Sequence, residues 1–185
     1  MSALITQNSL LLNKLLEFYN KNDNMEKILP IINGESLVSL RLIDWFATNY
    51  SKKNYTVYPL KMKNGENKRF KVYIDYKLKL KAYSKKRFDP FCRWDRITIP
   101  YKNDTYIQTT IGQLNFFRWA LENKILDYIN QNVTKINNDM NNRNSTAKNR
   151  KEKSSAKTRK KREELSISAS KSIKKEQVEI IVDFK

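Results

Sequence analysis

Hydrophobic residues recur at helical intervals in the first fifty residues of the chain. Over about residues 9–20, leucines and aromatic side chains return every three or four positions, which predicts an amphipathic helix. Asp23, with Glu26 three positions later, has the spacing of a capping pair and predicts a second, short helix that Pro30 limits or kinks. A third helix is expected over about residues 38–50, with its aromatic side chains in the core.

The most regular apolar stripe lies further along the chain. Thr110 and Gln113 have capping-box spacing, so a helix is expected to begin at Ile111. It should run for about seven turns, bend near residues 122–123 and form the spine of the fold. The asparagines from Asn137 onward are expected to end it. Its apolar positions are Leu114, Phe117, Leu121, Ile125, Ile129, Val133 and Ile136.

Between these helical regions, apolar residues alternate with polar ones. Residues 55–60 and 70–74 flank an Asn-Gly pair at positions 64–65, which supplies the positive φ angles of a tight turn and predicts a β-hairpin. The alternation continues beyond this hairpin, but the Leu, Lys and Ala content favours a helix over about residues 76–85.

A second short hairpin is expected from residues 96–100 and 105–108. The fold class predicted is therefore α+β, a helical core with small antiparallel β-hairpins, in a single domain over residues 1–140. Residues 141–176 are expected to form a basic, disordered C-terminal arm, because they show no apolar periodicity. Residues 177–185 alternate again and predict a strand that returns to the domain.

Charge is the strongest functional signal in the sequence. The chain carries 37 Lys and Arg against 19 Asp and Glu, a formal net charge of +18. Residues 51–102 hold sixteen basic and four acidic residues, and residues 141–185 hold fourteen and six, whereas the rest is almost neutral. Such concentrated positive charge predicts an anionic partner.

The composition excludes several classes of site. The chain has no His, a single Cys at position 92 and three Gly. It therefore lacks His-based triads, His or multi-cysteine metal sites, disulfides, phosphate-binding P-loops and dinucleotide fingerprints. We expect a non-enzymatic protein with no catalytic residues, metal or cofactor. No run approaches the roughly 20 apolar residues of a membrane span, and no secretory signal is recognised, so no membrane partner is expected.

The candidate nucleic-acid-binding residues lie in the two basic blocks. Lys and Arg neutralise phosphates, and the ten aromatic residues among them would stack on bases if exposed. The competing interpretation makes the aromatics core residues and the lysines a solvated face. The predicted contact residues are Lys77, Lys79, Lys81, Lys85, Lys86, Arg87, Arg93, Arg96, Lys157, Arg159, Lys160, Lys161 and Arg162.

The peptide at residues 88–96 admits two interpretations. Its aspartates could hold Arg93 and Arg96 in place, so that the turn presents both arginines and Trp94 to a ligand. Alternatively, Asp89 could pair with Arg93 in a buried network that locks the turn onto the core. The second interpretation is favoured, because two aspartates lie together in a region otherwise poor in acid.

Three peptides carry a resemblance to a known group of proteins. Residues 39–46 (SLRLIDWF), 86–93 (KRFDPFCR) and 112–120 (GQLNFFRWA) resemble uncharacterised proteins of nucleocytoplasmic large DNA viruses, the mimivirus-like group. The resemblance spans most of residues 9–140. It implies a viral setting, in the host cell cytoplasm or the virion, with the host nucleus as a further location, and it brings no assigned activity.

The leading functional prediction is a non-enzymatic nucleic-acid-binding protein of a large DNA virus, acting in genome condensation, packaging or viral gene expression, with DNA favoured over RNA. The alternative is a virion scaffold or host-protein interaction module that meets acidic viral or host surfaces. A distant alternative is a metal-dependent nuclease, with Asp75 and Lys77 at a strand end and Glu66 or Asp44 as the second acid.

Overall fold

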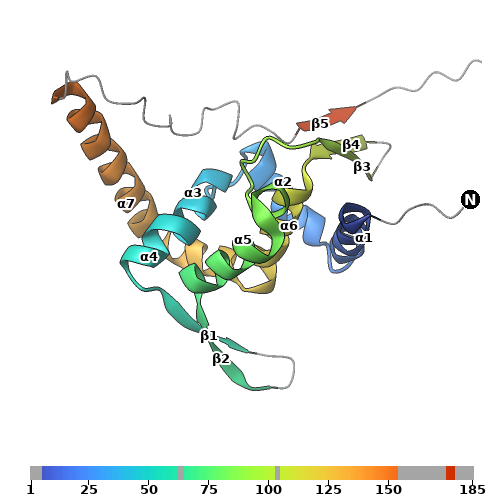
Figure 1. The fold of residues 1–185 in the computed structure, drawn as a ribbon, viewed down its shortest axis with the longest axis horizontal. Helices are drawn as coiled ribbons and strands as arrows, with labels where there is room; N and C mark the ends of the chain where they lie inside the picture. The colour runs from blue at the N-terminus through green and yellow to red at the C-terminus, as the bar shows by residue number, and fades with distance from the viewer. Residues whose placement is uncertain (1–5, 62–64, 103–104, 154–173, 178–185) are drawn as a thin grey trace, which may run out of the picture.

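The computed structural model describes residues 6–61, 65–102, 105–153 and 174–177, and it is mainly helical (Figure 1). The predicted helical core with small antiparallel hairpins is confirmed. Its elements are α1 (Gln7–Tyr19), α2 (Asn24–Asn33), α3 (Leu40–Trp45), the π-helical η1 (Phe46–Tyr50), α4 (Ser51–Lys53), β1 (Val57–Lys61), β2 (Asn67–Lys71), α5 (Val72–Phe88), β3 (Ile97–Tyr101), β4 (Thr105–Thr109), α6 (Ile111–Glu122), α7 (Ile125–Lys153) and β5 (Lys174–Gln177).

Helix α6 lies at the centre of the core, in contact with α1, α5 and α7. Its residues from 111 to 120 are buried, except for a half-buried Arg118. Thr110 caps the helix as predicted, because its Oγ1 accepts a hydrogen bond of 3.2 Å from the Gln113 N–H. Tyr19 of α1 donates a hydrogen bond of 2.6 Å to the Leu114 carbonyl, and burial raises the pKa of this phenol.

The predicted spine is broken between α6 and α7, and α7 has a further kink at Asn132, where φ is −126° and ψ is 18°. Helix α6 ends at Glu122 and α7 begins at Ile125, so the break falls where the sequence predicted a bend. Lys124 has a φ of 52°, and the Asn123 side chain donates a hydrogen bond of 2.8 Å to the Trp119 carbonyl. The apolar stripe nevertheless continues across the break, because Ile125 and α7 remain packed on the core.

Helix α7 continues to Lys153, so the prediction that asparagines from Asn137 end it is wrong. Tertiary contacts explain the difference. Asp139 accepts hydrogen bonds from Trp45 Nε1 at 3.1 Å and Lys53 Nζ at 2.9 Å, and Met140 is buried. Burial raises the pKa of Asp139, but these two hydrogen bonds and the nearby cations bring it below its ordinary value. These contacts tie α7 to the α3–α4 segment and outweigh weak helix propensity.

Two predictions at the N-terminal helices also needed correction. Asp23 does precede α2, but it has a φ of 52° and its side chain makes no capping hydrogen bond. The third predicted helix changes type at Phe46, where a π-helical turn begins. Ser51 Oγ donates a hydrogen bond of 2.8 Å to the Ala47 carbonyl in this turn, which is a known way for a hydroxyl to perturb a helical ladder.

The first predicted hairpin is present as β1 paired antiparallel with β2, from Val57 opposite Lys71 to Lys61 opposite Asn67. The second strand was expected to continue to residue 74, and this is wrong, because Val72 already begins α5. The Val72 N–H still donates a hydrogen bond of 3.3 Å to the Thr56 carbonyl, but the Val72 side chain is buried in the core and the chain turns helical there. The helix predicted to follow the hairpin is confirmed, with an earlier start.

The second predicted hairpin is also present, as β3 paired antiparallel with β4. Strand β5 then pairs with β4 on its other side and makes a three-stranded sheet. The paired residues are Lys174–Gln177, most of which were expected in the disordered arm rather than in the strand predicted over residues 177–185. The rest of the predicted arm and strand, residues 154–173 and 178–185, lies outside the described residues. Within the described ranges, no helix has both the length and the apolar character needed to cross a membrane.

Candidate nucleic-acid interface

Three predicted contact residues share one side of α5. Lys77 and Lys81 are exposed and lie four residues apart in the regular part of α5. Lys85 is also exposed and follows the non-helical Ser84, and all three lysines line one groove along the helix. Residues four apart lie one above the other on a helix, about 6 Å apart along its axis. Lys79 lies between two of them in sequence but is half-buried. The structure therefore gathers the three exposed lysines and separates Lys79 from them.

The opposite side of α5 fixes its orientation on the core. Tyr76 is buried, and its ring centroid lies 5.8 Å from that of Phe88 and 5.7 Å from that of Trp119. Asp75 accepts a hydrogen bond of 2.7 Å from Trp119 Nε1, which links α5 to α6. Because these contacts hold one face of α5 inward, the lysines are held outward on a rigid support.

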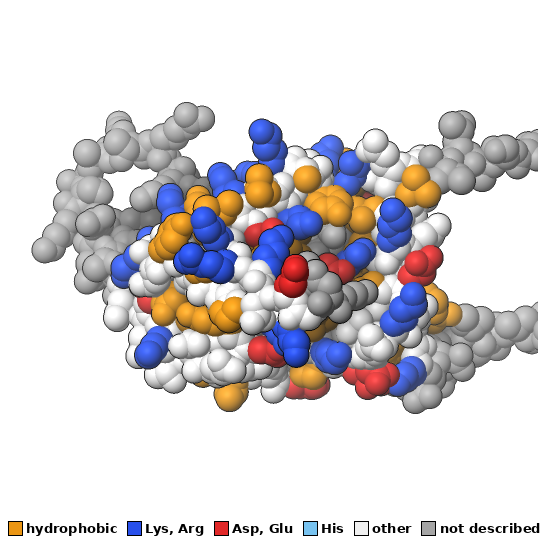
Figure 2. Space-filling model, turned by 90° about the horizontal axis from the view of Figure 1, so that it is seen from below, with side chains coloured by type: hydrophobic (Ala, Val, Ile, Leu, Met, Phe, Trp, Pro, Cys, Tyr) orange, Lys and Arg blue, Asp and Glu red, His pale blue; other side chains and the backbone are white. Residues whose placement is uncertain are grey.

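Strand β2 adds further cations that the sequence analysis did not single out. Lys68, Arg69 and Lys71 are exposed, and only Phe70 of this strand is buried. The hairpin projects from the helical core below α5 (Figure 1), and β2 runs directly into that helix. Seen from below, Lys and Arg side chains are spread over the molecule with hydrophobic patches among them (Figure 2). The charge of β2 is visible in the sequence, but its exposure follows from the projecting hairpin. We call Lys77, Lys81 and Lys85 with Lys68, Arg69 and Lys71 the cationic surface.

Among the residues that the structure describes, no carboxylate forms a salt bridge with the cationic surface. In the described part of residues 51–102, salt bridges involve Lys53, which bonds Asp139, and Lys102, which bonds Glu26. The hydrogen bond and charge of Glu26 raise the pKa of Lys102. The cationic surface therefore carries positive charge that no described carboxylate neutralises, which favours an anionic ligand.

In the turn after α5, one predicted side-chain pairing is not formed. Asp89 does not pair with Arg93: its Oδ1 accepts a hydrogen bond of 2.9 Å from the Phe91 N–H, and Arg93 is exposed. The favoured buried Asp–Arg network is therefore wrong. Short-range bonding of an Asp to the backbone two residues on is common in turns and needs no arginine. Arg96 is also exposed, so the presentation of both arginines to a ligand stays a prediction.

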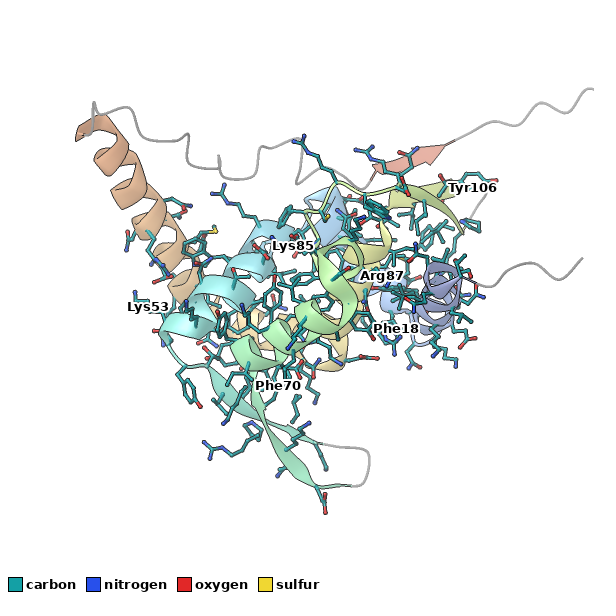
Figure 3. All side chains as sticks on the ribbon, viewed as in Figure 1. Phe18, Lys53, Phe70, Lys85, Arg87 and Tyr106 are labelled. Atoms are coloured by element: carbon teal, nitrogen blue, oxygen red, sulfur yellow. The ribbon has the colours of Figure 1, made fainter. Side chains whose placement is uncertain are left out.

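Lys86 and Arg87 are adjacent, but they lie in different environments. Lys86 is exposed, with its Nζ 3.7 Å from the centroid of the Trp94 ring in a cation–π contact. Arg87 turns toward α1, where its Nε donates a hydrogen bond of 2.7 Å to Asn8 Oδ1 and its Nη1 one of 3.2 Å to Gln7 Oε1 (Figure 3). Arg87 therefore ties two helices together, and we leave it out of the proposed interface.

Most aromatic residues of the basic middle block are buried in the core or packed against it. Phe70, Tyr76 and Phe88 are buried, and the Tyr58 ring stacks on Tyr128 with centroids 5.1 Å apart. Among the ten, Tyr55 is the one that is largely exposed, at 63%. The interpretation of these aromatics as mainly core residues fits the structure better.

The residues considered for a nuclease site are also placed differently. Asp75 lies within α5 rather than at a strand end, and it bonds Trp119. Burial, and then the charge of Asp89, raise the pKa of Asp44 to about 7. Burial followed by the charges of Asp44 and Asp89 also raises the pKa of Tyr76. No group of three or more Cys, Asp or Glu arranged for a metal ion occurs among the described residues.

The predicted contact residues of the tail, Lys157, Arg159, Lys160, Lys161 and Arg162, lie outside the described residues. They remain predictions from the sequence.

Comparison with known proteins gives the chain a family. Residues 4–185 match a family of unknown function, DUF7197. The chain belongs to this family. It is also similar to an uncharacterized protein, L507, of Acanthamoeba polyphaga mimivirus, with 43% identity over 131 residues. That match confirms the predicted resemblance to mimivirus-like viral proteins. It covers 68% of this chain and 49% of the relative, so the chain spans about half the length of the curated relative. No solved structure matches this DUF7197 chain.

Proposed function

We propose that the protein binds nucleic acid through the cationic surface, without enzymatic activity and largely without sequence preference. The observation that supports this most directly is the row of exposed lysines Lys77, Lys81 and Lys85, which line one groove of α5 and form no salt bridge with a described carboxylate. Phosphate groups are the anions that such a row of lysines fits best, because each ammonium acts as a point charge without geometric selectivity.

The proposed mode of binding depends on phosphate contacts. Sequence is read in nucleic acids by side chains that bond base edges in a defined geometry, such as bidentate Arg, Asn or Gln. Exposed lysines instead neutralise phosphate charge and fix the position of the protein on the nucleic acid, without reading its sequence. The role that follows is condensation or packaging of a viral genome, or a supporting role in viral gene expression, with DNA favoured over RNA. The tail residues Lys157 and Arg159–Arg162 would add charge to the same interaction.

A salt series with charge variants tests the proposal. If about 6 to 10 phosphates are contacted, the affinity of the full chain for a DNA duplex should fall on the order of a thousandfold or more between about 50 and 200 mM salt. The variant carrying Lys77→Gln, Lys81→Gln and Lys85→Gln should reduce the slope of log affinity against log salt by about 2 to 3, because each lost contact removes roughly 0.9.

The matched control removes the same charge elsewhere. Lys14, Lys21 and Lys135 are exposed and lie outside α5 and the hairpin, so their replacement by Gln should change the slope much less. An equal effect of both triple variants would show that net charge, not the cationic surface, determines binding. Absence of binding to DNA and RNA at 50 mM salt would refute the proposal. Salt-sensitive binding to an acidic polypeptide in its place would favour the interaction-module alternative.

A further inference from the structure

An open groove runs along the outer side of α5. It has a volume of about 620 Å³ and combines apolar and cationic side chains. Ile74 is 45% exposed and Leu78 is 61% exposed, although both are large aliphatic residues. The groove is lined by Tyr73, Ile74, Lys77, Leu78, Leu80, Lys81 and Lys85.

The exposed aliphatic pair is placed among the lysines of the cationic surface. Other exposed hydrophobic side chains, such as Leu10 and Leu37, lie outside this groove. Ile74 and Leu78 are four residues apart, as are Lys77 and Lys81, so an apolar stripe and a cationic stripe run beside each other along the helix. A ligand that covers both stripes must be anionic and must also present apolar surface.

A nucleic-acid duplex meets only the first of these requirements. Its phosphates are outside, but its base faces are stacked on one another and are not available to cover Ile74 and Leu78. A single strand presents both, because its phosphates accompany unstacked bases whose faces can pack against apolar or aromatic side chains. The groove volume lies within the range of about 300–1,000 Å³ seen for small-molecule sites, so nucleobases fit in it.

We propose that the groove of α5 binds single-stranded nucleic acid, with bases against Ile74 and Leu78 and phosphates on Lys77, Lys81 and Lys85. This inference rests on the proposed function and specifies its ligand. The ring of Tyr73 lines the same groove and has Lys52 Nζ 5.7 Å from its centroid, so an aromatic face and a further cation lie at its edge. Ser84 breaks the helical geometry just before Lys85, which still lines the groove.

The test compares two ligands and two kinds of variant on the full chain. Binding of a 20-nucleotide oligothymidine and of a 20-base-pair duplex is measured by fluorescence anisotropy at fixed salt. The wild type should bind the single strand about tenfold more tightly or better, since a tenfold gain requires the burial of only roughly 56 Å² of apolar surface. Ile74→Ser with Leu78→Ser should remove most of this preference and leave duplex affinity unchanged. Leu10→Ser with Leu37→Ser is the control, because it removes exposed aliphatic surface outside the groove.

The outcomes separate this inference from the proposed function. The Lys77, Lys81 and Lys85 variant should weaken both ligands, and that result supports the proposed function whether or not the groove prefers single strands. Equal wild-type affinity for both ligands, or a serine variant that keeps the preference, overturns the single-strand inference alone. The serine variant could instead change the sedimentation coefficient of the protein and leave its binding of oligothymidine unchanged. That result would assign the groove to a protein contact, and it would also overturn the single-strand inference. Failure to bind either ligand removes both proposals.

Discussion

Arg87 and Asn8 are joined by a hydrogen bond of 2.7 Å from the guanidinium Nε to the amide Oδ1, across 79 positions of the sequence. This bond holds the beginning of α1 against the end of α5. The backbone at Arg87 is held from a second side, because its carbonyl accepts a hydrogen bond of 2.9 Å from Asn115 Nδ2 of α6. A residue that composition alone assigns to a basic interface is thus part of the helical framework.

Replacing Arg87 should therefore change the stability of the protein, whereas replacing Lys85 should change its DNA binding. Arg87→Ala should lower the free energy of unfolding by about 1 to 3 kcal/mol, as expected for hydrogen bonds to a charged group, and leave the salt slope of DNA binding unchanged. Lys85→Ala should leave stability within about 0.5 kcal/mol of wild type and lower the slope by about one. Urea unfolding and a salt series measure the two quantities. Reversal of this pattern would place Arg87 in the interface.

The protein should be more stable with glycine at position 84 in place of Ser84. It has a φ of 65° and a ψ of 166°, a region that glycine occupies readily and other residues enter at a cost of about 1 to 3 kcal/mol. Ser84→Gly should therefore raise the free energy of unfolding by about 1 kcal/mol. The matched control is Ala82→Gly, an exposed position in the helical part of α5, which should lower it by a similar amount. Thermal unfolding of both variants checks the sign, and a loss in each would contradict the strained backbone.

Stability should fall as pH rises because of Asp44. Its pKa is raised in the folded protein from an ordinary 3.8 to about 7, by burial and then by Asp89. The folded state therefore holds a proton that the unfolded state has released, and this contribution is lost between about pH 4 and 7. At pH 8, Asp44→Asn should be more stable than wild type by about 1 to 4 kcal/mol, since one pKa unit corresponds to about 1.4 kcal/mol. At pH 4 the two should be nearly equal.

Urea unfolding at both pH values measures this effect. Asp95→Asn serves as the control, because that carboxylate lies on the exposed surface of the turn. A gain that is the same for both variants would trace the effect to net charge, and would contradict a specific cost of ionising Asp44.

The sequence predicted those elements whose signals are local. The Thr110 cap depends on residues three apart, and the hairpins depend on alternation and a turn, so both were readable without the fold. The length of α7 was not, because the bonds that hold it at Asp139 come from Trp45 and Lys53, some ninety positions earlier. The start of α5 at Val72 was not readable either, because it depends on the burial of Val72 in the core, which the alternation along β2 does not show.

The same distinction applies to the candidate interface. Helical spacing was sufficient to predict that Lys77 and Lys81 share a side of a helix, once the helix was assumed. It does not account for Lys85, which joins them beyond the break at Ser84. Composition could not distinguish Arg87 from its neighbours, because its partner Asn8 is distant in sequence. The Asp89 to Arg93 pairing failed for the opposite reason: a backbone N–H two residues away was a closer partner than the arginine.

The three tryptophans of the chain lie in three separate parts of the molecule, each with its own polar neighbour. The Trp119 indole is buried and bonds Asp75, the Trp45 indole bonds Asp139, and Lys86 lies over the Trp94 ring. Intrinsic fluorescence therefore contains three independent reporters. With two of the three replaced by Phe, the remaining indole reports on the core, on the attachment of α7, or on the turn beside the cationic surface, without an attached dye.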